Sequence, residues 1–361
     1  MRALRTNLIL PFLGTLLFAA VAQADTIYKT DGDAIEDVKV TKEALDLVTY
    51  RAEGSRKEAT IASDSVLRVE FSKKPELVDS ADGAALTDAY FPAINDFESF
   101  LADAGGKAPK GFAWSINYSL YRLVQMNMVV GELDKAVVAA DRFLTEAPES
   151  RYVPLVYLAK ARALFDSGKG SDAGAAVGQL MAMSDSGKVG ARWGLEAEVH
   201  AVIFKGGKGT ADIAKYKSLA TKAAKDFPIV ASRARIAAAE ALMSDKKVAD
   251  AEKLCREVIK SGQGDARTLA GAYKTLGDCL YQRASGDGKL LNDAVLAYMR
   301  VVVVYEKEFA YSPHSMLYAG LAFRALGGDG NEERAQKMFT TVRRRFPGTR
   351  YADEAKSLRK R

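Results

Sequence analysis

The sequence predicts a mainly α-helical protein, in which a solenoid of stacked helical hairpins follows a small β module and an N-terminal leader. Three observations support this prediction. Small residues recur on apolar helical faces from about residue 84 onward, 37 to 43 residues apart where neighbouring units are recognised. Residues 25–71 consist instead of short runs rich in β-branched and aromatic residues. The first 24 residues have the layout of an export signal.

The leader is the stretch MRALRTNLILPFLGTLLFAAVAQA. It has an arginine-bearing start, an apolar run over residues 8–21, and the small residues Ala22 and Ala24 at the positions of an A-x-A cleavage site. These features predict a signal peptide over 1–24 that is cleaved after Ala24. An uncleaved anchor is the alternative, but Pro11 and Gly14 interrupt the run, which is short for a bilayer span.

The mature chain is therefore expected to be soluble and either periplasmic or secreted. It is not expected to be a lipoprotein, because Cys255 is the first cysteine in the sequence. Cleavage would remove Arg2 and Arg5 and lower the net charge from +6 to +4. Such a mild charge gives no reason to expect nucleic acid as a partner, and it leaves room for an anionic one.

Residues 25–74 are expected to form a small β module. Its five segments are separated by turn-type residues such as Asp31-Gly32 and Glu53-Gly54. Short strands of this kind suggest a small curled barrel of the SH3-like or Sm-like type. The segments are 25–30, 34–41, 45–52, 58–62 and 66–71. A polar stretch at 72–83 is the expected boundary to the helical domain.

Residues 75–361 are expected to form the helical domain, because one pattern repeats along them. Ala136 has a turn glycine five residues before it, an alanine four after, Phe143 seven after and Pro148 twelve after. The alanines that anchor the pattern are Ala93, Ala136, Ala173, Ala251, Ala294 and Ala335. A gap of 78 residues between the third and the fourth predicts a further unit at 189–228, with Tyr216 in place of the alanine.

A second pattern lies upstream of several anchors and marks the first helix of each hairpin. It includes a small residue, Gly277 or Gly320, that would let the second helix approach closely. The two clearest copies are Tyr273, Leu276, Gly277, Leu280 and Met316, Ala319, Gly320, Phe323. We expect extra length relative to an ideal repeat to lie mainly in turns, as in residues 284–292.

Together these residues resemble the tetratricopeptide repeat (TPR), over roughly residues 84–361 and in about seven units. With FPGTRYADEA near its end, an exported array of this kind is similar to the envelope repeat proteins of Gram-negative bacteria. Those include the outer-membrane assembly lipoprotein and the Tol-Pal-associated coordinator of cell division. The resemblance implies a non-enzymatic scaffold that binds a protein or peptide partner in the cell envelope.

A solenoid binds its partners on the concave face, which the first helices line. Positions between the packing residues of those helices are predicted to contact the partner, and tyrosine and arginine are favoured there. An ordinary mixed surface is the alternative interpretation. The predicted groove residues are Tyr118, Tyr121, Gln125, Met128, Leu158, Arg162, Phe165, Lys274, Asp278, Tyr281, His314 and Arg324.

No motif indicates an enzyme, and we expect neither a cofactor nor a metal. His200 and His314 have no acid or cysteine at ligand spacing, and the glycine-rich tract 201–215 lacks the hydroxyl residue that follows the lysine of a phosphate loop. Cys255 and Cys279 leave two interpretations open: a structural disulfide, or two buried thiols.

A basic C-terminus supports an alternative function. Together with the β module it would bind cell-wall glycan or anionic lipid, while a solvated helix face is the simpler interpretation. The basic residues are Arg343, Arg344, Arg345, Arg350, Arg359, Lys360 and Arg361.

Overall fold

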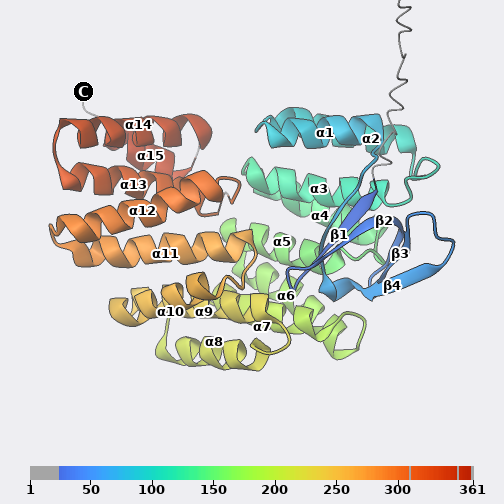
Figure 1. Ribbon diagram of the computed structural model, residues 1–361, viewed down its shortest axis with the longest axis horizontal. Coiled ribbons are helices and arrows are strands. Elements are labelled where there is room, and N and C mark those ends of the chain that lie inside the picture. The colour runs from blue at the N-terminus through green and yellow to red at the C-terminus, as the bar shows by residue number, and fades with distance from the viewer. Residues whose placement is uncertain (1–23, 309, 348, 359–361) are drawn as a thin grey trace, which may run out of the picture.

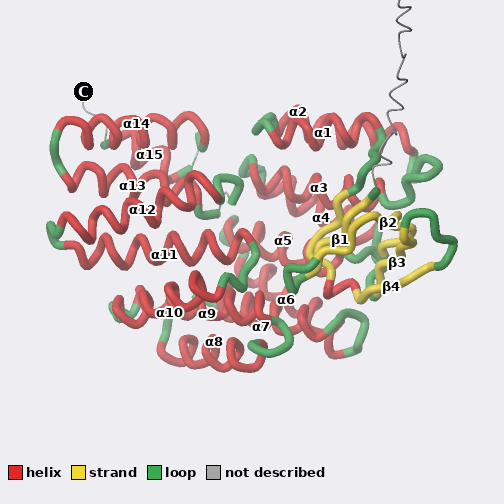
Figure 2. Tube along the Cα trace, viewed as in Figure 1, coloured by secondary structure: helices red, strands yellow, loops and turns green. Residues whose placement is uncertain are grey.

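The computed structural model describes residues 24–308, 310–347 and 349–358 (Figure 1). The signal peptide predicted for residues 1–24 therefore lies outside the described residues, apart from Ala24. Figure 2 shows the strands gathered in one place while helices make up the rest of the molecule. The chain is mainly helical, as the sequence predicts, with one small antiparallel sheet at its N-terminal end.

Each of the five predicted strand segments forms a strand. They are β1 (Asp25–Lys29), β2 (Ala34–Glu43), β3 (Leu47–Ala52), β4 (Glu58–Ala62) and β5 (Val66–Glu70). All pairings are antiparallel, and the strand order is β4-β3-β2-β1-β5.

The sheet is open rather than a closed barrel, and this corrects the predicted architecture. Among the described residues β4 and β5 are its two edges, and no pairing joins them. The reason lies in the packing. Ile27, Val40 and Val48 share one apolar cluster with Phe97 and Leu120 of the helical domain. The sheet thus buries its apolar face against helices, so it has no need to curl onto itself.

Fifteen helices follow among the described residues. They are α1 (Glu76–Leu86), α2 (Tyr90–Ala104), α3 (Ser115–Val129), α4 (Leu133–Glu146), α5 (Val153–Asp166), α6 (Gly170–Asp185), α7 (Ala191–Phe204), α8 (Thr210–Ala223), α9 (Pro228–Ser244), α10 (Val248–Ser261), α11 (Ala266–Ala284), α12 (Gly288–Val304), α13 (Ser312–Leu326), α14 (Asp329–Arg345) and α15 (Arg350–Ser357). Each packs against the next, so the chain makes seven hairpins and a closing helix. The unit predicted at 189–228 is the hairpin α7–α8.

The odd-numbered helices form the inner layer. The main contacts between helices that are not consecutive join odd-numbered members, from α1 and α3 through to α13 and α15. A curved stack brings its inner helices closest, so the first helix of each hairpin lies on the concave side, as expected for a solenoid. The six anchor alanines all lie on even-numbered helices and are fully buried, and Tyr216 is 1% exposed.

Two hairpins show how the small residues work. A Cβ atom added to Gly277 on α11 would lie 2.5 Å from the Tyr298 ring of α12, and one added to Gly320 on α13 would lie 2.6 Å from the Phe339 ring of α14. In each case the aromatic ring occupies the space that a larger residue on the first helix would need. This is the close helix approach that the sequence predicts for the repeat.

The polar stretch 72–83, expected as the boundary to the helical domain, contains most of α1, whose buried Val78, Ala81 and Ala85 follow a helical spacing among polar neighbours. One prediction of segment length is wrong, because the extra length near 284–292 is not in a turn. The turn is confined to residues 285–287, while α11 and α12 are lengthened to 19 and 17 residues.

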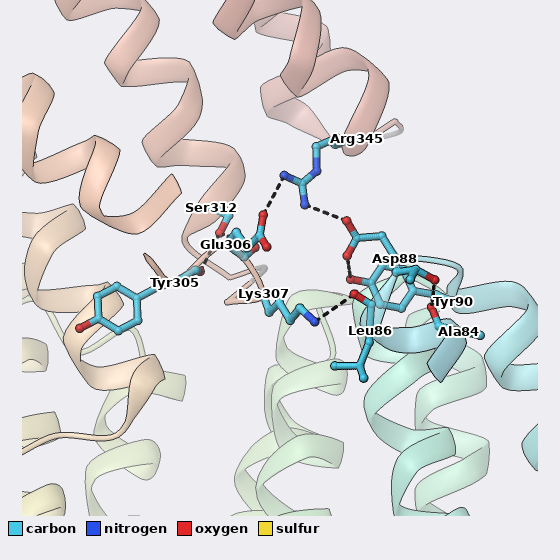
Figure 3. A network of polar contacts seen from close by, with 10 residues as sticks. Ala84, Leu86, Asp88, Tyr90, Tyr305, Glu306, Lys307, Ser312 and Arg345 are labelled. Carbon is cyan, nitrogen blue, oxygen red and sulfur yellow. Dashed lines mark hydrogen bonds and ion pairs between the residues drawn. The ribbon is translucent and has the colours of Figure 1, made fainter. Parts of the chain in front are cut away.

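The hairpins form two arms whose ends meet. In Figure 1 the helices α1–α6 descend on one side, α7 and α8 lie at the bottom, and α9–α14 ascend on the other side. Arg345, at the end of α14, pairs with Asp88 between α1 and α2 at 3.1 Å and with Glu306 at 3.4 Å. Lys307 donates to the Leu86 carbonyl at 3.2 Å. Figure 3 shows Arg345 between these two carboxylates, and we call this set of contacts the arm junction.

Candidate partner-binding cavity

A cavity of about 770 Å³ lies between the two arms. On the N-terminal side it is lined by β5, α1, α3 and the start of α5; on the C-terminal side by the start of α11 and the loop after α12. The lining residues most relevant to binding are Leu67, Arg68, Glu70, Phe71, Asp82, Tyr118, Tyr121, Arg122, Gln125, Arg151, Tyr152, Arg267, Lys307 and Glu308.

Aromatic side chains form the N-terminal wall of the cavity. The Tyr121 ring stacks on the Tyr152 ring with centroids 4.5 Å apart, and the Gln125 amide donates to the Tyr121 hydroxyl oxygen at 2.8 Å. Burial raises the pKa of both tyrosines, so each keeps its proton at neutral pH. These rings are fixed by stacking before any partner arrives, which lowers the entropic cost of binding.

Asp82 of α1 organises the charges beside this wall. It accepts a hydrogen bond from the Tyr118 hydroxyl at 2.8 Å and pairs with Lys74 at 2.6 Å and with Arg122 at 3.4 Å. The Arg122 Nε atom is buried and has no hydrogen-bond partner among the described residues. This donor is therefore unsatisfied within the described part of the fold.

A buried ion pair joins the sheet to the helices at the same wall. The Arg151 guanidinium, at the start of α5, pairs with the Glu43 carboxylate at the end of β2. Both side chains are almost fully buried, and Arg151 also lies over the Tyr152 ring at 4.1 Å. Burial alone would lower the pKa of Arg151, but the Glu43 carboxylate together with Tyr152 and Tyr121 outweighs it and the net pKa is raised. The pair thus fixes Tyr152 and positions the sheet.

The C-terminal wall carries charges of both signs. Asp265 caps α11, accepting from the Thr268 amide, and pairs with Arg233 of α9 at 2.5 Å. Burial raises the pKa of Glu308. The Arg267 side chain is exposed and makes no hydrogen bond or ion pair within the described part of the chain. It is the cation on this wall most available to a partner.

The structure brings three of the twelve predicted groove residues together in this cavity: Tyr118, Tyr121 and Gln125. The other four from the N-terminal units lie on inner helices but do not line it. Met128 and Leu158 are half-buried, Phe165 packs on Phe204 with ring centroids 5.0 Å apart, and Arg162 pairs with Asp166 on its own helix.

The five predicted residues of the C-terminal units do not line the cavity either. Asp278 pairs with Lys274 at 3.0 Å and with His314 at 2.7 Å, and it accepts from the Tyr298 hydroxyl at 2.8 Å. Tyr281 packs edge-on against Tyr318. Arg324 pairs with Glu332 and donates to a backbone carbonyl near the chain end. These side chains join neighbouring helices, so their polar groups are already used within the fold.

The remaining chemistry-bearing residues are buried. Cys255 and Cys279 are free thiols with no exposed surface. Burial raises the pKa of Cys279 to about 12, which keeps this thiol protonated and unreactive. Burial lowers the pKa of His200 to about 4, so His200 is neutral. In the described residues no group of His, Cys, Asp or Glu is placed to hold a metal ion, and no helix there has the length and apolarity of a membrane span.

Sequence reasoning missed the lining residues that come from strand β5 and from the ends of helices. From the sequence β5 is expected in a separate module, and the sequence of a single strand does not indicate which helices the strand will contact. Arg151 and Tyr152 had a visible signal in the sequence, because the same pair of residues recurs in PESRY and PGTRY.

No protein-family model matches the chain, and no curated protein matches its sequence. Three solved structures are similar to this chain. A tetratricopeptide repeat protein from Parabacteroides merdae ATCC 43184 has 13% identity and a TM-score of 0.45, covering 78% of this chain and 97% of that one. PilW, described as a widely conserved type IV pilus biogenesis factor, has 12% identity and a TM-score of 0.33, covering 77% and 96%. The human IFIT1 dimer with m7Gppp-AAAA has 13% identity and a TM-score of 0.38, covering 80% and 66%. At these values the repeat architecture of the chain rests on its own hairpin packing.

Proposed function

We propose that this chain is a non-enzymatic scaffold of the bacterial cell envelope that binds a protein or peptide partner in the cavity between its arms. One observation carries the proposal: the inner helices of the solenoid and strand β5 line a cavity that contains stacked tyrosines and arginines. Tyrosine and arginine dominate the energetics of protein interfaces, because they bury a large area and still offer hydrogen bonds.

The electrostatics of the lining support recognition. Asp82 is already held by Lys74, Arg122 and the Tyr118 hydroxyl, so its carboxylate is a structural acceptor. The exposed Arg267 keeps donor groups for an incoming acceptor. The cavity is thus equipped to orient a partner through polar contacts.

An exported location is part of the proposal and rests on the leader sequence. Asp25 would be the first residue after cleavage, and its carboxylate accepts from the Val40 amide at 2.9 Å and from the Ser72 amide at 3.0 Å. The described fold therefore begins with the residue that would become the mature terminus. The intact mass of the protein recovered from the periplasm tests this part. We expect a chain that begins at Asp25, and a chain retaining residues 1–24 would contradict it.

Peptide binding provides the test of the scaffold itself. A phage-displayed library of random twelve-residue peptides is selected against the full chain, and the affinities of the selected peptides are measured by fluorescence anisotropy. Tyr121→Ala removes a stacked ring from the cavity and is expected to weaken binding about tenfold or more. Gln125→Ala, which leaves the ring in place, should have a smaller effect.

Tyr281→Ala is the matched control, because Tyr281 also lies on an inner helix and packs on another tyrosine but does not line the cavity. We expect it to bind the selected peptides as the wild type does. Equal losses for Tyr121→Ala and Tyr281→Ala would place binding elsewhere. Selected peptides that bind the wild type, Tyr121→Ala and Tyr281→Ala with equal affinity would contradict the proposal.

Binding of wall glycan or anionic lipid is the competing function, and the same proteins test it. Arg345 is engaged in the arm junction, so the basic C-terminal surface is smaller than the sequence suggests. In this test the protein is sedimented with purified wall material. Co-sedimentation that disappears at high salt but is unaffected by Tyr121→Ala would favour this function over the scaffold.

A further inference from the structure

We infer that the partner enters the cavity as an extended peptide segment that adds a strand to the free edge of β5. This inference deepens the proposed function and rests on it. The observation behind it is a juxtaposition: an unpaired sheet edge runs along the wall of the cavity between the arms.

The residues that β5 contributes show that its edge, and not one of its faces, borders the cavity. Side chains of a strand alternate between the two faces, so a face would contribute every second residue. Here four consecutive residues of β5, Leu67–Glu70, and the residue that follows the strand, Phe71, line the cavity. Arg68 and Glu70 lie on one face, where both contact Tyr28, while Phe71 on the other stacks on Trp114 at 3.6 Å. Both sets reach the cavity only along the edge.

This edge has unpaired backbone groups. β5 pairs with β1, through partners such as Ile27 and Val69, and has no other neighbour in the described sheet. Alternate N–H and C=O groups of an edge strand point away from the sheet, and they bind an extended peptide through a ladder of hydrogen bonds. Hydrogen bonds of this kind need no particular side chain, so the edge supplies affinity while the rest of the cavity supplies selectivity.

The size of the cavity agrees with one added strand. A strand residue with a rise of about 3.3 Å, a strand spacing of about 4.8 Å and a sheet thickness of about 10 Å occupies about 160 Å³. A volume of about 770 Å³ would then hold about five residues. The stretch Leu67–Phe71 along the wall has about the same length, so a peptide of this size would pair along this part of the edge.

The charges select acidic side chains in that peptide. Six lysine or arginine residues and four carboxylates line the cavity. Arg267 on the C-terminal wall is exposed and forms no hydrogen bond or ion pair within the described residues, and Lys307 on the same wall donates to a backbone carbonyl. The stacked Tyr121 and Tyr152 rings on the N-terminal wall offer an apolar contact. We therefore expect an extended segment in which acidic and apolar residues alternate.

An N-methyl scan of the tightest peptide from the library distinguishes a strand from other modes. Each backbone amide is methylated in turn and the affinity for the full chain is measured. A peptide paired along one edge donates from every second amide, so we expect losses with a period of two residues. Losses at every interior position would indicate a helical peptide, and no loss at any position would indicate binding by side chains alone. Either of these results overturns the inference while leaving the scaffold proposal intact, because the peptide still binds and still responds to Tyr121→Ala.

Amide hydrogen exchange on the full chain with the same peptide gives a second readout with an internal control. We expect slower exchange in β5, residues 66–70, and no change in β4, residues 58–62. β4 is the other edge, but its residues lie outside the cavity. Protection of β4 without β5 would overturn the inference. If no peptide is selected at all, the proposed function fails together with it.

The charge preference is tested with Arg267→Gln. This side chain is exposed and forms no ion pair within the described chain, so the substitution should leave the fold intact. We expect acidic peptides to bind about fivefold more weakly, with little change for a variant peptide in which glutamine replaces each acid. Arg344→Gln is the control, since Arg344 is exposed on α14 away from the cavity. Equal affinity of Arg267→Gln and wild type for acidic peptides would refute the acidic preference.

Discussion

The two arms of the molecule use the same local sequence for different purposes. In both copies of the P-x-x-R-Y motif the arginine lies over the following tyrosine and donates to its hydroxyl: Arg151 over Tyr152, and Arg350 over Tyr351. In the N-terminal arm the arginine is buried against Glu43 of the sheet, and the tyrosine lines the cavity. In the C-terminal arm Arg350 is exposed and the motif begins the last helix.

The inner helices of the two arms also differ in how their polar residues are used. Those of the C-terminal arm carry the most regular repeat packing, with Gly277 and Gly320 against aromatic rings. Their inner polar residues bind one another, as Asp278 does with Lys274 and His314. The N-terminal arm is covered by a sheet and leaves Tyr121 and Gln125 facing the cavity. The most regular repeat packing therefore lies in the arm that contributes fewer residues to the cavity, and resemblance to an ideal repeat is a poor guide to the site.

The largest expected effect concerns the ion pair that makes the N-terminal arm different. Glu43→Ala would leave the Arg151 guanidinium buried without its partner, which costs about 3–5 kcal/mol of unfolding free energy. Glu58→Ala is the control: its partner Arg51 is half-exposed, so we expect a loss below about 1 kcal/mol. Urea unfolding curves measure both. Similar losses for the two variants would mean that docking of the sheet does not depend on the buried pair.

An intermediate effect is expected from glycine substitutions in the two arms. Gly277→Ala would place a methyl group 2.5 Å from the Tyr298 ring, and such overpacking costs about 1–3 kcal/mol. Gly174→Ala, on α6, meets nothing within 4 Å and should stabilise its helix by up to about 1 kcal/mol. Thermal unfolding checks the sign of each change. A neutral Gly277→Ala would show that the regular packing of the C-terminal arm tolerates a larger residue.

The repeat could be predicted from the sequence because it depends on the spacing of small and apolar residues along each helix. Ala136, Ala294 and Ala335 mark the second helices through periods of three and four, and these periods depend only on helix geometry. Even the degenerate unit around Tyr216 was located from the length of the gap. Local patterns also predicted the five strands, because β-branched and aromatic residues mark each segment and turn residues separate the segments.

The site could be predicted only in part because it forms between elements far apart in the sequence. Tyr121 was found since it lies on an inner helix, whereas Arg267 and Lys307 reach the cavity only through the closing of the two arms. The sequence predicted a closed barrel instead of an open sheet for a related reason, because closure also depends on contacts between distant elements. Whether β5 meets β4 or a helix depends on what covers the apolar face, and that covering is supplied by residues such as Phe97 and Leu120.

The smallest expected effect concerns the junction that brings the arms together. Arg345 bridges Asp88 and Glu306, and these side chains are about a quarter to a half exposed, so Arg345→Gln should cost at most about 1 kcal/mol of stability. Its main consequence should be geometric. Spin labels at the exposed positions Thr87 and Thr340 report the separation of the arms, and we expect a broader, longer distance distribution in Arg345→Gln than in wild type. In 1 M salt, where the screening length falls to about 3 Å, the wild type should approach the variant. Arg344→Gln, one residue earlier on α14, should leave the distribution unchanged. If neither salt nor Arg345→Gln changes it, the arms are held by their packing alone, and the cavity is a permanent feature of the fold rather than one that opens at the junction.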